Sequence, residues 1–267
     1  ESGFIPMNVD YEMKQSKKLE GQVALVTGGG GAIGGASAKI LASSGAKVLV
    51  ADERAKMAKK IASEIISEGN MAEPFEFDVA VPEQAKAAVK AAESAFGGLN
   101  ILVNVAAAVT PDAPVEKLPF DQWNRAFSVN LSGPFLMAKF AIPAIRASKG
   151  GAIINMASQL GTIGVPNRSA YCTTKAGLIH LTTILASEVA GDNIRVNSIS
   201  PGVIETPRTR RRFQTKHEFH QARGKLHMLG RVGQPEEIGK SVLYFASDDA
   251  LWITGAILTV DGGESIK

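Results

Sequence analysis

Short apolar runs rich in β-branched residues alternate along the chain with longer amphipathic segments rich in alanine. Several of the short runs are apolar at nearly every position, which is typical of parallel strands that helices cover on both faces. The alternation predicts strands near residues 22–28, 47–52, 72–78, 99–105, 151–158, 193–200 and 255–262. It predicts helices near residues 33–44, 53–69, 82–96, 118–147, 168–190 and 235–247. We therefore expect an α/β, single-domain Rossmann fold with a doubly wound, seven-stranded parallel sheet and helices on both faces.

Length and composition are consistent with one domain. The chain has 267 residues, of which 45% are hydrophobic, and no repeat or low-complexity segment divides it. We expect residues 1–18 to form an N-terminal arm and residues 19–267 to form the domain. No apolar run approaches the roughly 18 residues of a membrane span, and the N-terminal stretch lacks the apolar core of a signal peptide. The single cysteine excludes an internal disulfide and fits a reducing compartment, so we expect a cytoplasmic protein with no membrane partner.

The charged residues are unevenly distributed. The net charge is only +3, which does not indicate nucleic-acid binding, and we expect none. Residues 208–225, however, contain seven basic side chains and a single acid, Glu218. This basic segment requires a local explanation.

The first predicted strand leads into a glycine-rich turn, TGGGGAIGG at residues 27–35, and then directly into a helix. Glycines let the backbone approach a pyrophosphate closely, and a helix N-terminus offers free N–H groups and the positive end of the helix dipole. In a doubly wound fold, ligands bind beyond the carboxyl ends of the strands. The turn therefore predicts a dinucleotide site.

An acidic residue, Asp52, ends the second predicted strand, eighteen residues after Gly34. A carboxylate at this place accepts hydrogen bonds from the adenosine ribose hydroxyls and repels a 2′-phosphate. Glu53 adds to the repulsion, whereas Arg54 would favour such a phosphate. Because two acids precede the arginine, we predict NAD rather than NADP as the cofactor.

The stretch YCTTK places Tyr171 and Lys175 four positions apart in a predicted helix, where their side chains share one face. The spacing alone is equally consistent with an ordinary helix surface. The chemical interpretation is that an ammonium within about 4–6 Å stabilises a phenolate and lowers the pKa of the tyrosine from about 10. A phenol with such a pKa can exchange a proton with an alcohol or a carbonyl group.

The motifs together resemble those of the classical short-chain dehydrogenases/reductases, and the resemblance covers residues 19–263. TGGGGAIG is similar to the glycine-rich turn of that family, FDV near residue 78 to its adenine contact, and NVAA at 104–107 to its NNAG segment. SVNL, NMAS, YxxxK and SPGVIET follow in the order of the family. The resemblance implies that the cofactor contacts Gly28, Gly31, Ala32, Ile33, Gly34, Asp52, Asp78, Val79, Asn104, Ala106, Tyr171, Lys175, Pro201, Gly202, Ile204 and Thr206.

The resemblance also implies a catalytic set of Asn130, Ser158, Tyr171 and Lys175. Tyr171 would be the general acid/base, and Lys175 would lower its pKa and bind the nicotinamide ribose. Ser158, thirteen residues before Tyr171, would hold the substrate oxygen where charge develops. Asn130 would orient a water that passes the proton from Lys175 to bulk solvent. The implied activity is the NAD-dependent interconversion of a secondary alcohol and a ketone by hydride transfer.

The family carries a mobile substrate-covering segment after its PG motif, here a lid near residues 207–228. We expect Ser158, Gln159, Arg168 and Arg212 to contact the substrate. Because guanidinium groups bind carboxylate, sulfonate or phosphate through paired hydrogen bonds, the small-molecule alcohol or ketone is predicted to carry an anionic group. The basic residues are alternatively solvated, paired with acids elsewhere, or in contact with the phosphates of the cofactor.

Other proteins with a similar fold have different functions. One is a non-catalytic NAD-binding module whose basic segment recruits a partner, although such a module has no need of all four catalytic residues. Enoyl reductases of similar fold space tyrosine and lysine more widely, and sugar-nucleotide epimerases carry a longer C-terminal domain. The HEFH stretch at 217–220 lacks further ligands, so no metal site is expected. By resemblance, the helices near 118–147 and 168–190 should pair between subunits of a homotetramer.

Overall fold

The computed structural model describes residues 17–267, so all but the last two positions of the predicted arm lie outside the described residues. Seven parallel strands form one sheet in the order β3-β2-β1-β4-β5-β6-β7. They are β1 (Val23–Thr27), β2 (Lys47–Asp52), β3 (Ala72–Glu76), β4 (Ile101–Asn104), β5 (Gly151–Met156), β6 (Ile194–Pro201) and β7 (Ile257–Val260). The predicted seven-stranded parallel sheet is confirmed; β2 and β6 have the predicted length, and the other five strands are two to four residues shorter than expected.

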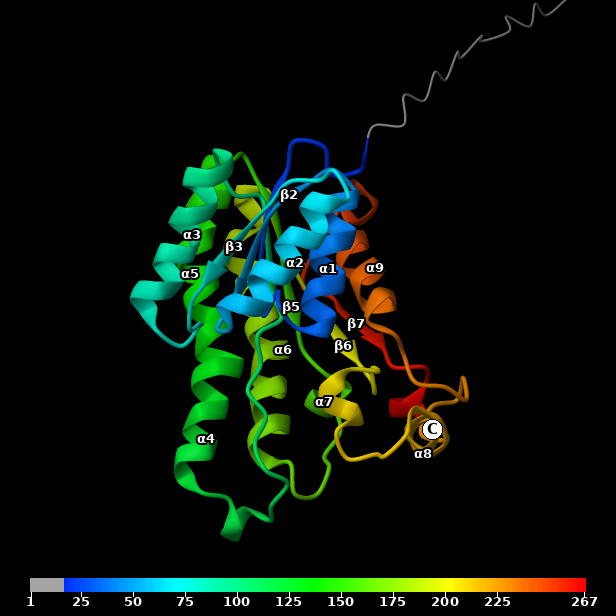
Figure 1. Cartoon of the computed structure of the whole chain (residues 1–267). Coiled ribbons are helices and arrows are strands. Elements are labelled where there is room, and N and C mark those ends of the chain that lie inside the picture. The colour runs from blue at the N-terminus through cyan, green and yellow to red at the C-terminus, as the bar shows by residue number, and fades with distance from the viewer. Residues whose placement is uncertain (1–16) are drawn as a thin grey trace, which may run out of the picture.

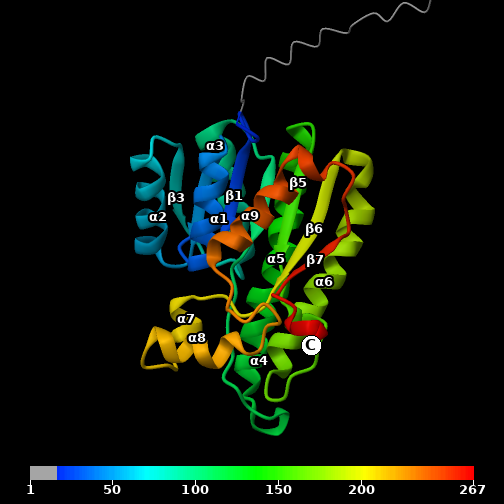
Figure 2. The same ribbon diagram turned by 90° about the vertical axis from the view of Figure 1, so that its right-hand side faces the viewer.

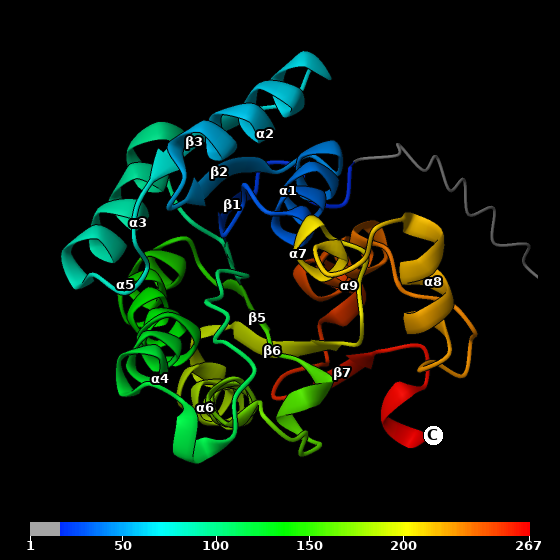
Figure 3. The same cartoon turned by 60° about the horizontal axis from the view of Figure 1, so that its bottom comes forward.

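Helices cover the sheet on both faces, as Figures 1 and 3 show. One layer contains α1 (Ala32–Ser43), α2 (Ala55–Ser67) and α9 (Pro235–Ala246), and the other contains α3 (Pro82–Phe96), α5 (Gly133–Ala147) and α6 (Ser169–Val189). Successive residues of β1 enter opposite cores, with Ala24 and Val26 packed in the α1 layer and Val23 and Leu25 in the α3 layer. This two-sided burial explains why the strands are apolar throughout.

The segment predicted to be helical near 118–147 is helical from Phe120 to Ala147, but it is not a single regular α-helix. The segment forms α4 (Phe120–Phe127), a π-helical turn (Ser128–Ser132) and then α5. Pro134 has no N–H to donate to the carbonyl of Asn130, so the α-helical hydrogen-bond ladder is interrupted at this point. The interruption lets α4 extend beyond the sheet, as Figure 1 shows, and it places the turn beside α6.

Two short helices, α7 (Pro207–Arg210) and α8 (Lys216–Gly224), follow β6 and lie at the same end of the sheet as α4 (Figure 2). A parallel bridge between Ile204 and Gly233 joins the two ends of this excursion. That the α7–α8 segment acts as a lid stays a prediction. The chain ends in a single turn, Glu264–Ile266, directly after β7. None of the helices within residues 17–267 is long and apolar enough to cross a membrane.

Candidate active site

The turn between β1 and α1 forms a cradle in which side chains have no room. Gly28 has a φ of +63°, and a Cβ atom there would lie 2.8 Å from the backbone nitrogen of Ala106. A Cβ atom at Gly34 would lie 2.1 Å from the carbonyl oxygen of Gly28. Helix α1 begins after Gly31 without a side-chain cap and without an acid in its first turn. Its free N–H groups therefore fit the pyrophosphate of a dinucleotide.

The carboxylate of Asp52, at the end of β2, is buried and accepts three hydrogen bonds. Its Oδ2 accepts the N–H of Gly30 at 3.0 Å, and its Oδ1 accepts the backbone N–H of Arg54 at 3.0 Å and the Nε–H of Arg54 at 3.1 Å. Arg54, which would favour a 2′-phosphate, is thus paired with Asp52, which would repel one.

Arg125 of α4 links two acids on the adenosine side of the predicted site. Its Nη1 lies 3.0 Å from Oδ2 of Asp78, and its Nη2 lies 3.4 Å from Oε2 of Glu53. Asp78 also accepts the backbone N–H of Ala80 at 2.9 Å. Asp78 and the neighbouring Val79, which is buried, are therefore held in place from α4 as well as from their own loop.

The loop after β4 is held by hydrogen bonds to the side chain of Thr27. The hydroxyl oxygen of Thr27 accepts the N–H groups of Val105 and Ala106 at 3.0 and 3.2 Å. Asn104 donates to Oδ1 of Asn155 at 2.9 Å, while its own Oδ1 is buried without a partner in the described part of the chain. A buried acceptor of this kind fits a site that receives a further hydrogen-bonding group.

Tyr171 and Lys175 share one face of α6, as their spacing predicts. The Nζ of Lys175 donates to the carbonyl oxygen of Met156 at 2.6 Å and lies 5.8 Å from the centroid of the Tyr171 ring. Lys175 is only 2% exposed. Burial, helped by the charge of Arg208, lowers the pKa of Lys175 to about 7.

The expectation of a lowered tyrosine pKa is wrong for the protein by itself. Burial raises the pKa of Tyr171, and the charges of Arg208 and Arg168 and a hydrogen bond with Ser158 only partly oppose that effect. The physical reason is that withdrawal of the Tyr171 phenol from water disfavours the charged phenolate, and this effect outweighs the neighbouring positive charges.

Asn130 lies in the π-helical turn, and all of its side-chain hydrogen bonds are to protein groups. Its Oδ1 accepts the N–H of Ala108 at 2.8 Å, and its Nδ2 donates to the Ala108 carbonyl at 3.1 Å and to Thr174 Oγ1 at 3.2 Å. Thr174 in turn donates to the carbonyl of Tyr171 at 2.9 Å. The side chain of Asn130 therefore connects three segments, and both of its N–H donors are used within the protein. The backbone carbonyl of Asn130 is also distinctive, because Pro134 has no N–H to donate to it as a residue of a regular α-helix would.

Ser158 follows β5 and begins a short 3-10 turn. Its hydroxyl donates to Oε1 of Gln159 at 3.1 Å and accepts the N–H of Leu160 at 3.2 Å. Both Ser158 and Gln159 are buried. The turn thus brings the predicted oxygen-binding serine beside Tyr171.

Arg168 and Arg212, the two arginines predicted to bind the substrate, lie close together as predicted. Both are paired with a carboxylate of the protein itself. Arg168 Nε lies 2.7 Å from Oδ1 of Asp112, and Arg212 Nη1 lies 2.5 Å from Oδ2 of the same residue. Asp112 lies in the loop after β4 and belongs to no recognised motif, so the sequence did not predict its contacts with the two arginines. Arg168 and Arg212 are therefore paired with a protein acid, as the alternative interpretation of the basic residues allowed.

The segment after β6 completes the predicted cofactor edge. Gly202, which follows Pro201, donates its N–H to the Val260 carbonyl at 3.1 Å, and Ile204 is buried. Thr206 caps α7, because its Oγ1 accepts the N–H of Thr209 at 3.1 Å. Its hydroxyl is therefore already used within the protein.

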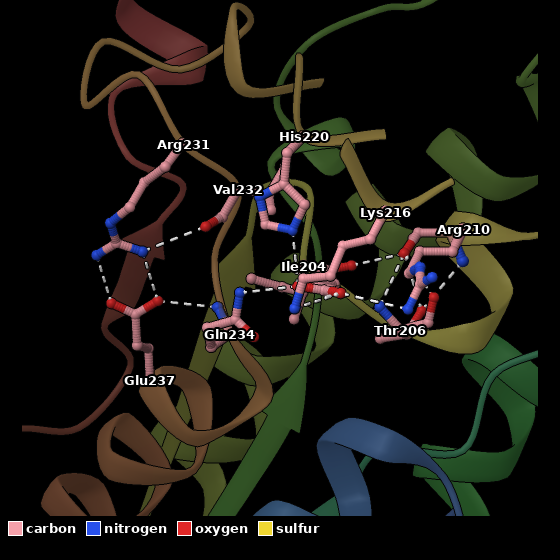
Figure 4. Close-up of polar contacts among 11 residues, drawn as sticks. Ile204, Thr206, Arg210, Lys216, His220, Arg231, Val232, Gln234 and Glu237 are labelled. Carbon is pink, nitrogen blue, oxygen red and sulfur yellow. Dashed lines mark hydrogen bonds and ion pairs between the residues drawn. The ribbon is translucent and has the colours of Figure 1, made fainter. Parts of the chain in front are cut away.

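Glu205, between Ile204 and Thr206, is a second residue that sequence reasoning missed. Its carboxylate lies 3.2 Å from Lys216, 2.8 Å from His220, 3.2 Å from Gln234 and 3.5 Å from Arg210. Figure 4 labels these four partner side chains. Burial favours a raised pKa for Glu205, but the hydrogen bonds from these donors outweigh it and lower the pKa to about 2.

Part of the basic segment is thus neutralised by acids elsewhere in the fold. Within residues 17–267, no three His, Cys, Asp or Glu side chains gather where they could hold a metal ion.

Comparisons with known proteins give the family of the chain. A short-chain dehydrogenase family model, described as "Enoyl-(Acyl carrier protein) reductase", matches residues 30–265. Cyclohexanol dehydrogenase from Acinetobacter sp. (strain SE19) is 40% identical, over 96% of this chain and 100% of its own. Trans-4-hydroxycyclohexanecarboxylate dehydrogenase from Sinomonas cyclohexanicum is 38% identical, over 94% of this chain and 95% of its own.

A solved structure shares the fold closely. The crystal structure of a short-chain type dehydrogenase/reductase from Mycobacterium marinum matches with a TM-score of 0.85 and 34% identity, and the match covers 95% of this chain and 98% of that one. The chain is therefore an oxidoreductase of the short-chain dehydrogenase/reductase family, whose dehydrogenases use nicotinamide cofactors.

Proposed function

We propose that the protein is an NAD-dependent dehydrogenase that interconverts a secondary alcohol on a six-membered ring and its ketone. The observation that carries the proposal is the assembly of Ser158, Tyr171 and the buried Lys175 at the carboxyl ends of β5 and β6. The ring-shaped substrate is suggested by the relatives named for cyclohexanol and hydroxycyclohexanecarboxylate.

Tyr171 is the proposed proton-transfer group. During oxidation its phenol oxygen takes the hydroxyl proton of the substrate, and in the reverse direction it returns that proton to the carbonyl oxygen. Ser158 binds the same substrate oxygen. Lys175, with a pKa of about 7, is able to give or take a proton near neutrality. The backbone carbonyl of Asn130, rather than its side chain, is the group we assign to a water that connects Lys175 to solvent.

The nicotinamide cofactor supplies the hydride acceptor when it is bound. The glycine cradle would hold its pyrophosphate, and Asp52 would bind its adenosine ribose. Lys175 would reach the nicotinamide ribose, and the backbone of Ile204 would bind the carboxamide.

The preference for NAD over NADP rests on Asp52 and Glu53. Arg54 is paired with Asp52 at 3.1 Å, and the charges of Asp52 and Glu53 together outweigh its single positive charge. We expect kcat/KM to be at least tenfold higher with NAD than with NADP. Equal values with the two cofactors would contradict the assignment.

The proposed activity is tested with Tyr171→Phe, which removes only the phenol oxygen. Turnover of cyclohexanol should fall by about 10²–10⁴-fold, because no other group is placed to exchange the proton. Binding of NADH, followed by its fluorescence, should be unchanged. A variant that oxidises the alcohol as fast as the wild type would overturn the mechanism.

We also propose that the preferred alcohol carries a carboxylate, which Arg168 and Arg212 bind in place of Asp112. Paired, charge-assisted hydrogen bonds from a guanidinium suit such a group. Against this stands the ion pair that both arginines already make. The basic segment gives less support to the alternative of a partner-binding module, since Arg210, Lys216 and Arg212 are paired within the fold. The Tyr–Lys spacing of four disfavours enoyl reduction.

We assign the protein to the cytoplasm on the evidence of its single cysteine.

A further inference from the structure

Arg125 of α4 bridges the ends of two neighbouring strands, β2 and β3. Its Nη1 lies 3.0 Å from Oδ2 of Asp78, just beyond β3, and its Nη2 lies 3.4 Å from Oε2 of Glu53, just beyond β2. The two contacts span 47 and 72 residues of sequence. Helix α4 extends beyond the sheet at the end where these parallel strands finish (Figure 1), so the arginine reaches both loops from a third segment.

Both loops are themselves anchored to the fold. The N–H of Phe77 donates to the carbonyl of Asp52 at 3.2 Å, which ties the end of β3 to the end of β2. Val79 is buried, and a Cβ atom at Gly133 would lie 2.9 Å from its Cγ1, so the loop after β3 packs tightly on the start of α5. Arg125 therefore spans a gap between two loops whose positions are fixed.

These two loops are the ones that a nicotinamide dinucleotide would use for its adenosine half. Asp52 stands where it would bind the ribose, and Asp78 and Val79 stand where they would contact the adenine base. A base that touches both loops enters the gap that Arg125 spans. The side chain of Arg125 is 43% exposed, so a ligand that arrives from solvent reaches it.

A guanidinium in this position suits a purine for two reasons. Its N–H groups donate to carboxylates in the plane of the group, which leaves its faces available to stack on an aromatic ring. Its positive charge also opposes the negative charges of Glu53 and Asp78, which repel the phosphates of a dinucleotide. Exposed ion pairs contribute little to the stability of a fold, so a protein without Arg125 is expected to fold.

We propose that Arg125 is a cofactor-binding residue: its guanidinium packs against the adenine base of the bound dinucleotide, and Glu53 and Asp78 hold it in that position. This inference rests on the proposed function, because it takes a nicotinamide dinucleotide as the cofactor. It extends that function by naming a residue that no motif of the sequence marks, on a helix that follows the nucleotide-binding strands.

The test measures the binding of NADH and of its two halves. Arg125→Met keeps an unbranched side chain but removes the planar cation. The dissociation constant of NADH, followed by its fluorescence, should rise about fivefold to tenfold, and its dissociation rate in stopped flow should rise as well. AMP, which carries the adenosine half, should lose affinity by a similar factor when it displaces NADH. Reduced nicotinamide mononucleotide, which lacks adenosine, should bind equally to variant and wild type.

Two further variants separate this contact from a general effect of charge. Arg125→Lys keeps the positive charge but has no planar face, so it should not recover the wild-type affinity for NADH. Arg146→Met removes an arginine of similar exposure from α5, where it pairs with Asp192, and should leave NADH binding unchanged.

The outcomes separate this proposal from the proposed function. An Arg125→Met protein with wild-type affinity for NADH and AMP would overturn the role of Arg125, and so would full recovery of affinity in Arg125→Lys. Equal losses for NADH and reduced nicotinamide mononucleotide would show a general loosening of the site and would overturn it too. If the wild-type protein binds NADPH but not NADH, the assignment of NAD fails, and the same comparison made with NADPH decides the role of Arg125.

Discussion

The side chain of Lys175 occupies a position in which its charge is disfavoured. It is almost fully buried, and burial lowers its pKa from 10.5 to about 7. Such a shift is a cost to stability that a protein retains where the titrating group is useful. Sequence spacing predicted where this lysine lies relative to Tyr171, but its burial depends on β5 and on the loop behind it.

Because the buried charge of Lys175 is unfavourable, we predict that Lys175→Met makes the protein more stable. In the native state the lysine is protonated only below about pH 7, and in the unfolded state it is protonated up to about pH 10.5. The unfavourable contribution is therefore complete below pH 7 and disappears as the pH rises to 10.5. Urea unfolding at one fixed protein concentration should show a gain of about 3 kcal/mol for the variant at pH 7.

The same experiment near pH 10 provides the control. The difference between variant and wild type should nearly vanish there, although both proteins will have changed for other reasons. A gain of the same size at both pH values would mean that packing, rather than the charge, is responsible.

At the level of elements, ion pairs over long sequence separations arrange the loops around the site. Asp112 joins the loop after β4 to the N-terminus of α6 through Arg168 and to the segment after α7 through Arg212. Glu205 joins the end of β6 to both α7 and α8. Helical periodicity predicted α6, but the basic segment carried no signal that showed which acids it meets.

Replacing Asp112 with asparagine should increase selectivity for anionic substrates. The two arginines would lose their common carboxylate and become available to a carboxylate of the substrate. We expect the ratio of kcat/KM for 4-hydroxycyclohexanecarboxylate to that for cyclohexanol to rise about fivefold to tenfold. In Arg168→Ala and Arg212→Ala the same ratio should fall, and no change in any of the three variants would leave these arginines as structural residues.

Glu205→Gln should loosen the α7–α8 segment. The neutral amide keeps the shape but loses the charge that Lys216 and His220 face. Hydrogen exchange across residues 207–224 should be faster in the variant at neutral pH. Glu236→Gln, a change at an exposed carboxylate in the first turn of α9, should not alter it.

The pH dependence of this difference has a defined sign. The pKa of Glu205 is lowered from 4.5 to about 2, so its charge contributes stability above pH 4.5 and loses that contribution as the pH falls towards 2. The variant and the wild type should therefore become alike in acid. Equal exchange at neutral pH would contradict the role of Glu205.

At the scale of the whole molecule, apolar side chains stand exposed on the helices for which subunit pairing was predicted. Phe120 of α4 is 75% exposed, Phe135 of α5 is 49% exposed and Ile184 of α6 is 43% exposed. Exposed apolar surface of this kind is typical of protein contacts. We therefore keep the homotetramer as a prediction.

Light scattering at micromolar concentration should give the mass of a tetramer for the wild type. The double variant Phe135→Glu/Ile184→Glu should give a dimer or a monomer, because charges would be buried in the predicted interface. Ile66→Glu replaces a residue of α2 that is 53% exposed and should leave the mass unchanged. A monomeric wild type would remove the prediction.

The sequence by itself determined the order of strands and helices, the glycine cradle and the shared face of Tyr171 and Lys175. These features depend on residues a few positions apart, where chain geometry alone fixes the neighbours. Only the tertiary structure decided which acid meets Arg212, how deeply Lys175 is buried and that Arg125 reaches Glu53. The first and last of these contacts span 100 and 72 residues. Their strength depends on distance and on exclusion of water, and both are set only when the whole chain has folded.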